Sequence, residues 1–355
     1  MNEVTELTGS DAPESTQHLS VQFTGRPGEY FRIWIVNIAL TVLTLGIYSA
    51  WAKVRTLRYF YSNTSIAGGH FDYHANPRSI LIGRFIAVAL FSIYYFGAQY
   101  FPNVSLLILL GVLLMAPWLL VRSRSFHMRN SSFNGIRFDF KRHYAGAFKV
   151  IYGGVAFAAV SLGLGTPSAL FWRNQFVANN SAYGMTRFAL SGTSTAFYFI
   201  YLKSIGIALT VFVLFGVFGA MFGKSFDLSD LDHETGQLVV LLPLAFFYLV
   251  LGVYVSVRQR NYVWNSLTLG NNRFLSDLSV RYMIWIYATN ILAIVFTFGL
   301  MIPWAKIRLA RYRADHLTVE MQDDPDAFAA ANTRDSSAIG DEVGSVFDVD
   351  VDLAF

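Results

Sequence analysis

The sequence contains no cysteine and little charge. The missing cysteine excludes disulfide bonds, a thiol nucleophile and a Cys-based metal site. Charged residues make up 14% of the 355 residues, against about 25% in a soluble domain, whereas 54% are hydrophobic and the mean hydropathy is +0.42. The first 20 residues are polar and acidic, so we expect no cleavable signal peptide. These features predict a membrane protein whose first apolar segment acts as its targeting signal.

The motifs of common enzyme classes are missing as well. The chain has no phosphate-binding Gly loop, no Ser nucleophile elbow, no HExxH and no dinucleotide fingerprint. We therefore expect a protein that is not an enzyme and that binds no cofactor. Basic residues alternate with aromatic residues, but they flank apolar segments, so nucleic acid is not an expected partner.

Seven apolar segments are long enough to cross a bilayer, which takes about 20 helical residues. The predicted spans are 30–52, 80–101, 103–121, 146–170, 197–222, 237–257 and 281–304. The predicted fold is an all-α, multi-pass membrane protein with about seven transmembrane helices. Arg84 and Lys203 lie within a turn or so of a span end, where long side chains reach the membrane surface. The spans hold no acid, which argues against a proton-driven carrier that uses a membrane carboxylate.

An apolar segment with a basic exit occurs twice in the chain. NIALTVLTLGIYSAWAKVRTLRYF at 37–60 aligns without a gap with NILAIVFTFGLMIPWAKIRLARYR at 290–313, and 11 of the 23 positions from 37 to 59 are identical. A second pattern follows several spans, namely Asn-Thr/Ser, a Gly about five residues later, and then Phe. It predicts a turn leading into a short strand or β-hairpin at the membrane surface. The turn residues of this module are Asn63, Thr64, Gly68, Asn130 and Gly135.

The repeats predict a 3+3+1 arrangement of the spans. Repeat 1 covers about 23–144, repeat 2 about 145–280 and an extra repeat helix about 281–319, all within a membrane domain at 21–319. Segments 1–20 and 320–355 are predicted disordered tails, and the second holds ten acids and one Arg.

The arrangement also predicts how the chain lies across the membrane. A three-span unit repeated in tandem reverses its orientation, which predicts inverted repeats. The positive-inside rule then places the N-terminus outside and the C-terminal tail in the cytoplasm. The alternative is a missed turn near 163–167, which brings the later modules to the same side as the earlier ones.

The stretch TLGIYSAWAKVR, within LTLGIYSAWAKVRTLRYFYSNT, is similar to the YjgN-like family of uncharacterised bacterial inner-membrane proteins (domain of unknown function 898). The resemblance covers roughly residues 23–317. It implies a multi-spanning protein of the bacterial inner membrane. It implies no activity and supplies no catalytic or binding residues.

Candidate site residues lie on one stripe of the repeated helix, because polar groups avoid lipid and the identities concentrate there. The stripe consists of Asn37, Thr44, Trp51, Asn290, Thr297 and Trp304, and the adjoining cations are Lys53, Arg55, Arg58, Lys306, Arg308 and Arg311. In one interpretation the Asn and Thr side chains join helices by hydrogen bonds worth about 1 kcal/mol or less. In a second, Asn37 and Asn290 face each other across a solute pathway and the Arg residues gather anions. In a third, the cations bind anionic lipid headgroups.

The group His70, Asp72 and His74 has H-x-D-x-H spacing, which places three potential metal ligands on one face of a strand. Other modules carry Arg137 and Arg187 near the position of His70 and no second His. We therefore expect a polar surface loop and no metal.

Two functional hypotheses follow from the sequence. The first is a transporter or channel-like protein for a small solute, with a polar cavity lined by the first, fourth and seventh spans. The second is a non-enzymatic envelope protein that binds the lipid bilayer, anionic lipid headgroups or a protein partner. Substrate and oligomeric state are left open.

Overall fold

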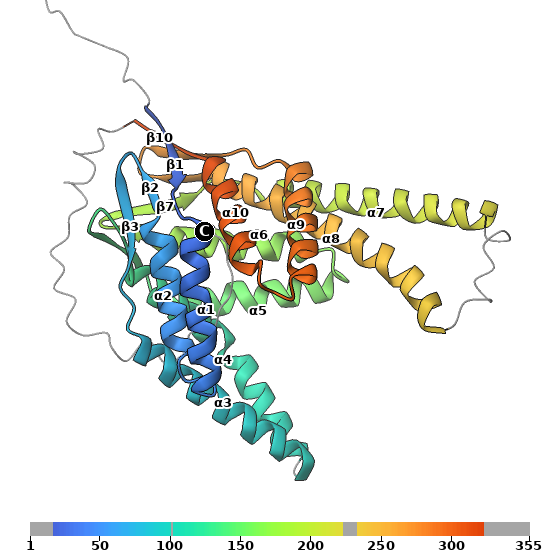
Figure 1. The fold of residues 1–355 in the computed structure, drawn as a ribbon, viewed down its shortest axis with the longest axis horizontal. Coiled ribbons are helices and arrows are strands. Elements are labelled where there is room, and N and C mark those ends of the chain that lie inside the picture. The colour runs from blue at the N-terminus through green and yellow to red at the C-terminus, as the bar shows by residue number, and fades with distance from the viewer. Residues whose placement is uncertain (1–16, 101, 223–232, 323–355) are drawn as a thin grey trace, which may run out of the picture.

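The computed structural model describes residues 17–100, 102–222 and 233–322, in which the chain forms ten helices and ten strands. The helices are α1 (Pro27–Leu43), α2 (Ser49–Ser62), α3 (Pro77–Tyr100), α4 (Pro102–Arg129), α5 (Tyr144–Val160), α6 (Thr166–Asn180), α7 (Ser194–Phe222), α8 (His233–Asn265), α9 (Val280–Phe296) and α10 (Ile302–Asp315). The strands are β1 (Gln17–Phe23), β2 (Thr64–Ile66), β3 (Gly69–Tyr73), β4 (Ser131–Phe133), β5 (Ile136–Phe140), β6 (Ser181–Tyr183), β7 (Thr186–Leu190), β8 (Leu267–Leu269), β9 (Asn272–Ser276) and β10 (Leu317–Met321). The strands gather at one end of the molecule, and the helices extend away from them (Figure 1).

The strands form a closed antiparallel barrel in the order β1-β10-β9-β8-β7-β6-β5-β4-β3-β2. Four tight hairpins supply β2 to β9, and neighbouring hairpins pair with each other, as Phe71 does with Phe133. The first and last strands complete the ring, with Gln17 opposite Met321, and β1 continues onto β2 with Val21 opposite Ile66. Every module and both ends of the described chain therefore meet in one barrel.

The prediction of an all-α fold is wrong, because the Asn-to-Phe modules are not separate local units. A lone two-stranded hairpin is marginally stable, and its open edges leave backbone groups unpaired. Closing the barrel pairs these edges with one another. Strands β1 and β10 also take in residues 17–20 and 320–321 of the predicted tails, and residues 1–16 and 323–355 of these tails lie outside the described residues.

The prediction of about seven transmembrane helices in a 3+3+1 arrangement is also wrong. The segments 30–52, 146–170 and 281–304 are each broken by a five-residue turn into a helical hairpin, namely α1/α2, α5/α6 and α9/α10. With α3/α4 and α7/α8, the described helices form five hairpins that alternate with strand pairs. The turn at 161–165 corresponds to the alternative of a missed turn near 163–167.

Inverted repeats are excluded by the same connections. Each helical hairpin begins and ends at the barrel, so the modules cannot lie on opposite sides of a membrane. Strand β1 pairs with β10, so the N-terminal strand cannot lie outside while the C-terminal strand lies inside. Among the described residues, three segments are long and apolar enough to cross a bilayer: Pro77–Tyr100, Asn103–Arg129 and Ser194–Leu214.

The three short hairpins share one turn geometry at their tips. In the first, Leu45 and Gly46 both adopt positive φ, +50° and +94°, and the Gly46 amide donates to the Thr41 carbonyl at 2.7 Å. The Thr44 hydroxyl donates to the Leu40 carbonyl at 2.7 Å and accepts the Tyr48 amide at 2.9 Å. Ser161 and Thr297 make the equivalent bonds in the other two hairpins. The hydroxyl therefore satisfies a backbone amide that the break in the helix leaves free.

The predicted turn residues of the modules lie at two kinds of position, at the ends of helices and in β-turns. Asn63 and Asn130 end their helices, and each amide donates to the carbonyl four residues earlier at 2.8 Å. The Thr64 hydroxyl does the same to the Phe60 carbonyl at 2.8 Å. Gly68 and Gly135 form the β-turns with φ of +82° and +78°.

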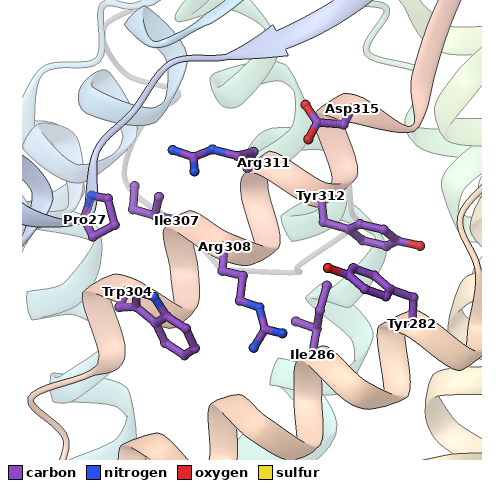
Figure 2. A pocket seen from close by; sticks show the side chains of 9 residues that line it. All are labelled: Pro27, Tyr282, Ile286, Trp304, Ile307, Arg308, Arg311, Tyr312 and Asp315. Carbon is purple, nitrogen blue, oxygen red and sulfur yellow. The ribbon is translucent and has the colours of Figure 1, made fainter.

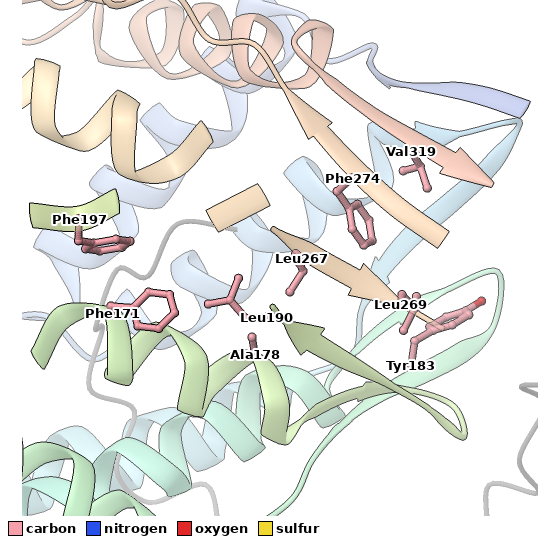
Figure 3. Packing of buried hydrophobic residues seen from close by; sticks show 9 residues of the cluster. All are labelled: Phe171, Ala178, Tyr183, Leu190, Phe197, Leu267, Leu269, Phe274 and Val319. Carbon is pink, nitrogen blue, oxygen red and sulfur yellow. The ribbon is translucent and has the colours of Figure 1, made fainter. Parts of the chain in front are cut away.

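The barrel interior is apolar and continuous with the bases of the helices (Figure 3). Its buried cluster consists of Phe171, Ala178, Tyr183, Leu190, Phe197, Leu267, Leu269, Phe274 and Val319. The module Phe residues face inward, and Phe138 lies within 6.5 Å of Phe188 by ring centroids. The Tyr183 hydroxyl donates to the Phe133 carbonyl at 3.2 Å, and burial raises the pKa of Tyr183 to about 12.

Candidate functional site

The two stripe asparagines hold the helices of their own hairpins together. The Asn37 amide nitrogen donates to the Ala52 carbonyl at 3.4 Å, and Asn290 donates to the Ala305 carbonyl at the same distance. Only 5% of Asn37 and 6% of Asn290 are exposed. Each asparagine therefore joins the two helices of its own hairpin by a hydrogen bond.

The carbonyl oxygens of these two side chains differ in their partners. Asn290 Oδ1 accepts from Arg308 Nη1 at 3.3 Å, and the same nitrogen donates to Thr289 Oγ1 at 2.6 Å. In the first copy Val36 stands at the position of Thr289, and Arg55, which matches Arg308, is exposed. Asn37 Oδ1 is consequently buried with no hydrogen-bond partner among the described residues.

One pocket, of about 190 Å³, lies between α9, α10 and the start of α1. Figure 2 shows Arg308 reaching from α10 toward Ile286, beside the Trp304 ring. Its guanidinium carbon lies 5.1 Å from the centroid of that ring, within cation–π range. Arg311 donates to the Gly25 carbonyl at 3.0 Å, and Asp315 also lines the pocket. Both Arg residues are thus engaged by the protein, and an acid stands beside them.

A larger groove, of about 630 Å³, lies on the other side of α10. Its walls come from α1, α2, α3 and α10, and its lining residues are Tyr30, Trp34, Asn37, Ile38, Thr41, Val42, Ser49, Ala52, Lys53, Thr56, Leu57, Arg84 and Lys306. Three of these residues are cationic, and none is acidic. Arg84 crosses from α3 to donate a hydrogen bond to the Ser49 hydroxyl at the tip of the first hairpin.

The groove lies beside the tip of the first short hairpin, because Val42 and Ser49 on either side of that turn line it. Val42 is 68% exposed, and Leu45 within the turn is 94% exposed. Among the described residues, Leu162 and Phe298 at the tips of the other two short hairpins are 93% and 98% exposed. Exposed apolar patches of this kind mark a membrane or protein contact. The groove therefore combines a cationic middle with an apolar rim.

The structure separates the six predicted cations. Lys53 and Lys306 line the groove, whereas Arg308 and Arg311 line the smaller pocket. Arg58 donates to the Tyr73 carbonyl at 3.2 Å. Arg55 points to the surface.

The remaining stripe residues have structural partners. Thr44 and Thr297 stabilise the tip turns, as described above. The Trp51 ring is half-buried and stacks on Tyr48 with ring centroids 6.2 Å apart. Of the two cavities described above, the groove is lined by Asn37, and Asn290 is among the lining residues of neither.

The H-x-D-x-H group lies on the outer face of β3 and just beyond it. His70 and Asp72 are exposed, and His74 Nε2 lies 2.8 Å from the Ser132 hydroxyl. In the part of the chain that the structure describes, no three His, Asp or Glu side chains are close enough to hold a metal ion.

Sequence reasoning missed two contributors to these sites. Arg84 was expected to reach the membrane surface alone, but it contacts Ser49 of the neighbouring hairpin. Thr289 was overlooked because it differs from its counterpart Val36, whereas the comparison of the two copies looked for identities. A polar residue in one copy and an apolar residue in the other was the signal available.

Comparison with known proteins agrees with a membrane location. The pattern that defines the family "Bacterial protein of unknown function (DUF898)" matches residues 18–346. A relative named "Inner membrane protein YjgN" from Salmonella typhimurium LT2 is 27% identical, over 87% of this chain and 90% of its own. Relatives of the same name from Escherichia coli O157:H7 and K12 are each 23% identical, over 83% of this chain and 87% of theirs. No solved structure matches the chain.

Proposed function

From the premise that this chain belongs to the DUF898 family of bacterial proteins of unknown function, we propose that it is a multi-pass inner-membrane protein that binds anionic phospholipid headgroups. The binding site is the groove between α1, α2, α3 and α10, and no chemical reaction is involved. The observation that carries this proposal is the groove itself, whose described lining residues include three cations and no acid beside an apolar rim. Basic pockets between membrane helices are suited to lipid headgroups.

The helix lengths support two kinds of membrane insertion. Helices α3 and α7 have 24 and 29 residues, about 36 and 44 Å at 1.5 Å per residue, which exceeds a hydrocarbon core of about 30 Å. Helices α1, α5 and α9 have 17 residues each, or about 25 Å. In the proposed arrangement α3, α4, α7 and α8 cross the bilayer, and the three short hairpins dip in and return on the same side.

The charge distribution supports a cytoplasmic barrel. Residues 85–121 contain no Lys or Arg, and residues 204–257 contain only Lys224. In the proposed arrangement these two stretches lie in the bilayer or on its far side from the barrel. The other 26 of the 27 Lys and Arg residues lie outside them. By the positive-inside rule, the barrel and both termini belong in the cytoplasm.

Headgroup binding is favoured over transport for a structural reason. The transport hypothesis rested on inverted repeats, and the closed barrel places all modules together. The groove is lined by helices of the first, second and seventh predicted spans, whereas the hypothesis required the first, fourth and seventh.

Lipid binding to the purified protein tests the proposal. Native mass spectrometry in a neutral detergent would compare dioctanoyl phosphatidylglycerol with dioctanoyl phosphatidylcholine. Each cation near a headgroup contributes about 1 kcal/mol, so a Lys53→Gln, Lys306→Gln double variant should lose roughly 30-fold in affinity for the anionic lipid. Lys203→Gln removes an exposed charge of α7 outside the groove and should change nothing. Equal binding of both lipids by the unaltered protein would contradict the proposal.

A further inference from the structure

We infer that the groove selects phospholipids whose headgroup carries a hydroxyl next to the phosphate, as in phosphatidylglycerol, and that Asn37 Oδ1 accepts the hydrogen bond from that hydroxyl. The inference rests on the proposed function, because it names the ligand of the same groove. It starts from the difference between the two copies of the repeated helix.

The second copy shows what the Asn carbonyl oxygen requires. Asn290 Oδ1 is satisfied from within the protein by Arg308 Nη1 at 3.3 Å. In the second copy the Thr289 hydroxyl also accepts a hydrogen bond from the Arg308 guanidinium. In the first copy Val36 stands at the position of Thr289, and Arg55, at the position of Arg308, is exposed. Arg308 thus occupies this position in the second copy, whereas in the first copy Asn37 lines the groove and its Oδ1 has no partner among the described residues.

The open oxygen can be satisfied only by a donor. Asn37 keeps its amide nitrogen on the Ala52 carbonyl at 3.4 Å, as Asn290 does on Ala305, so the same amide orientation occurs in both copies. A carbonyl oxygen accepts hydrogen bonds and cannot donate them. With 5% of the residue exposed and Oδ1 buried without a partner, a ligand that brings a donor into the groove gains a hydrogen bond.

The charges of the groove decide which donor it takes. Lys53, Arg84 and Lys306 favour a phosphate, and none of the described residues that line the groove is acidic and able to pair with an ammonium group. Ethanolamine headgroups are therefore disfavoured, whereas the hydroxyls of a glycerol headgroup bring donors without positive charge. Ile38 and Val42, which are 40% and 68% exposed, offer an apolar wall for the acyl chains. The volume of about 630 Å³ is in the usual range for a small-molecule site.

A pair of lipids with equal charge isolates the hydrogen bond. Dioctanoyl phosphatidylglycerol and dioctanoyl phosphatidylmethanol both carry one phosphodiester, but only the first has hydroxyl donors. A neutral hydrogen bond is worth about 1 kcal/mol, so the unaltered protein should bind phosphatidylglycerol about fivefold more tightly in native mass spectrometry. Asn37→Leu should reduce this preference to about onefold while both lipids still bind. Equal affinities in the unaltered protein would overturn the inference.

Asn290→Leu is the matched control. It removes the same bond between the helices of a hairpin, but its carbonyl oxygen is already occupied by Arg308, so the preference for phosphatidylglycerol should remain. Loss of the preference in both variants would assign the effect to hairpin packing and would overturn the inference. Displacement of the lipid by soluble glycerol phosphate at equal concentration would also overturn it, because a lipid site needs the acyl chains.

Failure of the proposed function gives a different result. In that case phosphatidylmethanol would bind no better than phosphatidylcholine, which has the same chains and no net charge. The inference alone fails when phosphatidylmethanol binds as tightly as phosphatidylglycerol and both exceed phosphatidylcholine.

Discussion

Replacing Thr297 by Val tests how the short hairpins turn inside an apolar environment. The hydroxyl of Thr297 donates to the Ala293 carbonyl at 2.6 Å and accepts the Met301 amide at 3.1 Å. Val has almost the same shape, so the change removes the hydroxyl without opening a cavity. The Ala293 carbonyl keeps a partner, because the Thr297 backbone amide also donates to it at 3.1 Å. The Met301 amide loses its hydrogen bond.

The expected effect follows from that single orphaned amide. In the proposed arrangement this tip lies in the bilayer, where water cannot replace the lost partner, and a donor left without a partner in such surroundings costs about 1–3 kcal/mol. At about 2.1 cal/mol/K of unfolding entropy per residue, each kcal/mol corresponds to about 1.3 °C in the midpoint of thermal unfolding for a chain of 355 residues. Thr297→Val should therefore lower the midpoint by about 1–4 °C in lipid nanodiscs. The added methyl group acts in the opposite direction, because it makes the tip more apolar.

Thr297→Ser is the matched control, since it keeps the hydroxyl and loses only a methyl group. It should unfold within about a degree of the unaltered protein. The same pair of substitutions at Thr44 should give the same order of stability. If the Val variant is as stable as the Ser variant at both tips, the hydroxyl does not satisfy the turn in the way described, or the tips lie in water.

Two further predictions concern the barrel. The chain has no native cysteine, so single cysteines can be placed at the exposed positions His70 and Arg187. Both should react with an impermeant thiol reagent in inverted vesicles, and neither should react in intact cells. Labelling of the two positions from opposite sides would contradict the single barrel. The Tyr183 pKa is raised from 10.0 to about 12 by burial, so an unfolded chain ionises first and stability should fall as the pH rises from about 10 to about 12. Tyr183→Phe should remove that extra fall in thermal midpoint relative to the unaltered protein, and an identical pH profile for the two would refute the assignment.

The sequence predicted the local structure of the modules better than their assembly. The Asn-to-Phe pattern indicated short hairpins, and Gly68 and Gly135 do form their turns. Barrel closure depends on pairs such as Phe71 with Phe133 and Gln17 with Met321, which lie far apart in the chain. Short strands of this kind carry no sequence signal for the partner with which they pair, so the barrel could not be predicted from one sequence.

Hydropathy did not reveal the turns that break the three short hairpins, because the turn residues are themselves mostly apolar. Every residue from Thr44 to Tyr48 is compatible with a membrane helix, so the window over 30–52 appears continuous. The signal that was present is Gly46 following Thr44-Leu45, a Gly inside an apolar run. Its repetition as Ser161-Leu162-Gly163 and Thr297-Phe298-Gly299 indicated a shared turn, whereas the identities were interpreted as a shared helix face.

The candidate groove was only partly predictable for a related reason. Asn37, Lys53 and Lys306 were recognised because they recur in both copies of the repeated helix. What distinguishes the groove is that Val36 stands where the second copy has Thr289, and the carbonyl oxygen of Asn37 has no hydrogen-bond partner among the described residues. A comparison that weighs differences between copies, as well as identities, finds such positions.

The pairing of the first strand with the last sets the order of events during synthesis. The ribosome makes β1 first and β10 roughly 300 residues later, which takes roughly 15–60 s at the usual rate of translation. Throughout that interval one edge of β1 has no partner, while all five helical hairpins emerge from the ribosome. The ring can close only after the last hairpin has been made. A chain that stops before Leu317 leaves open edges on both β1 and β9, which exposes an incomplete protein to proteases and to aggregation.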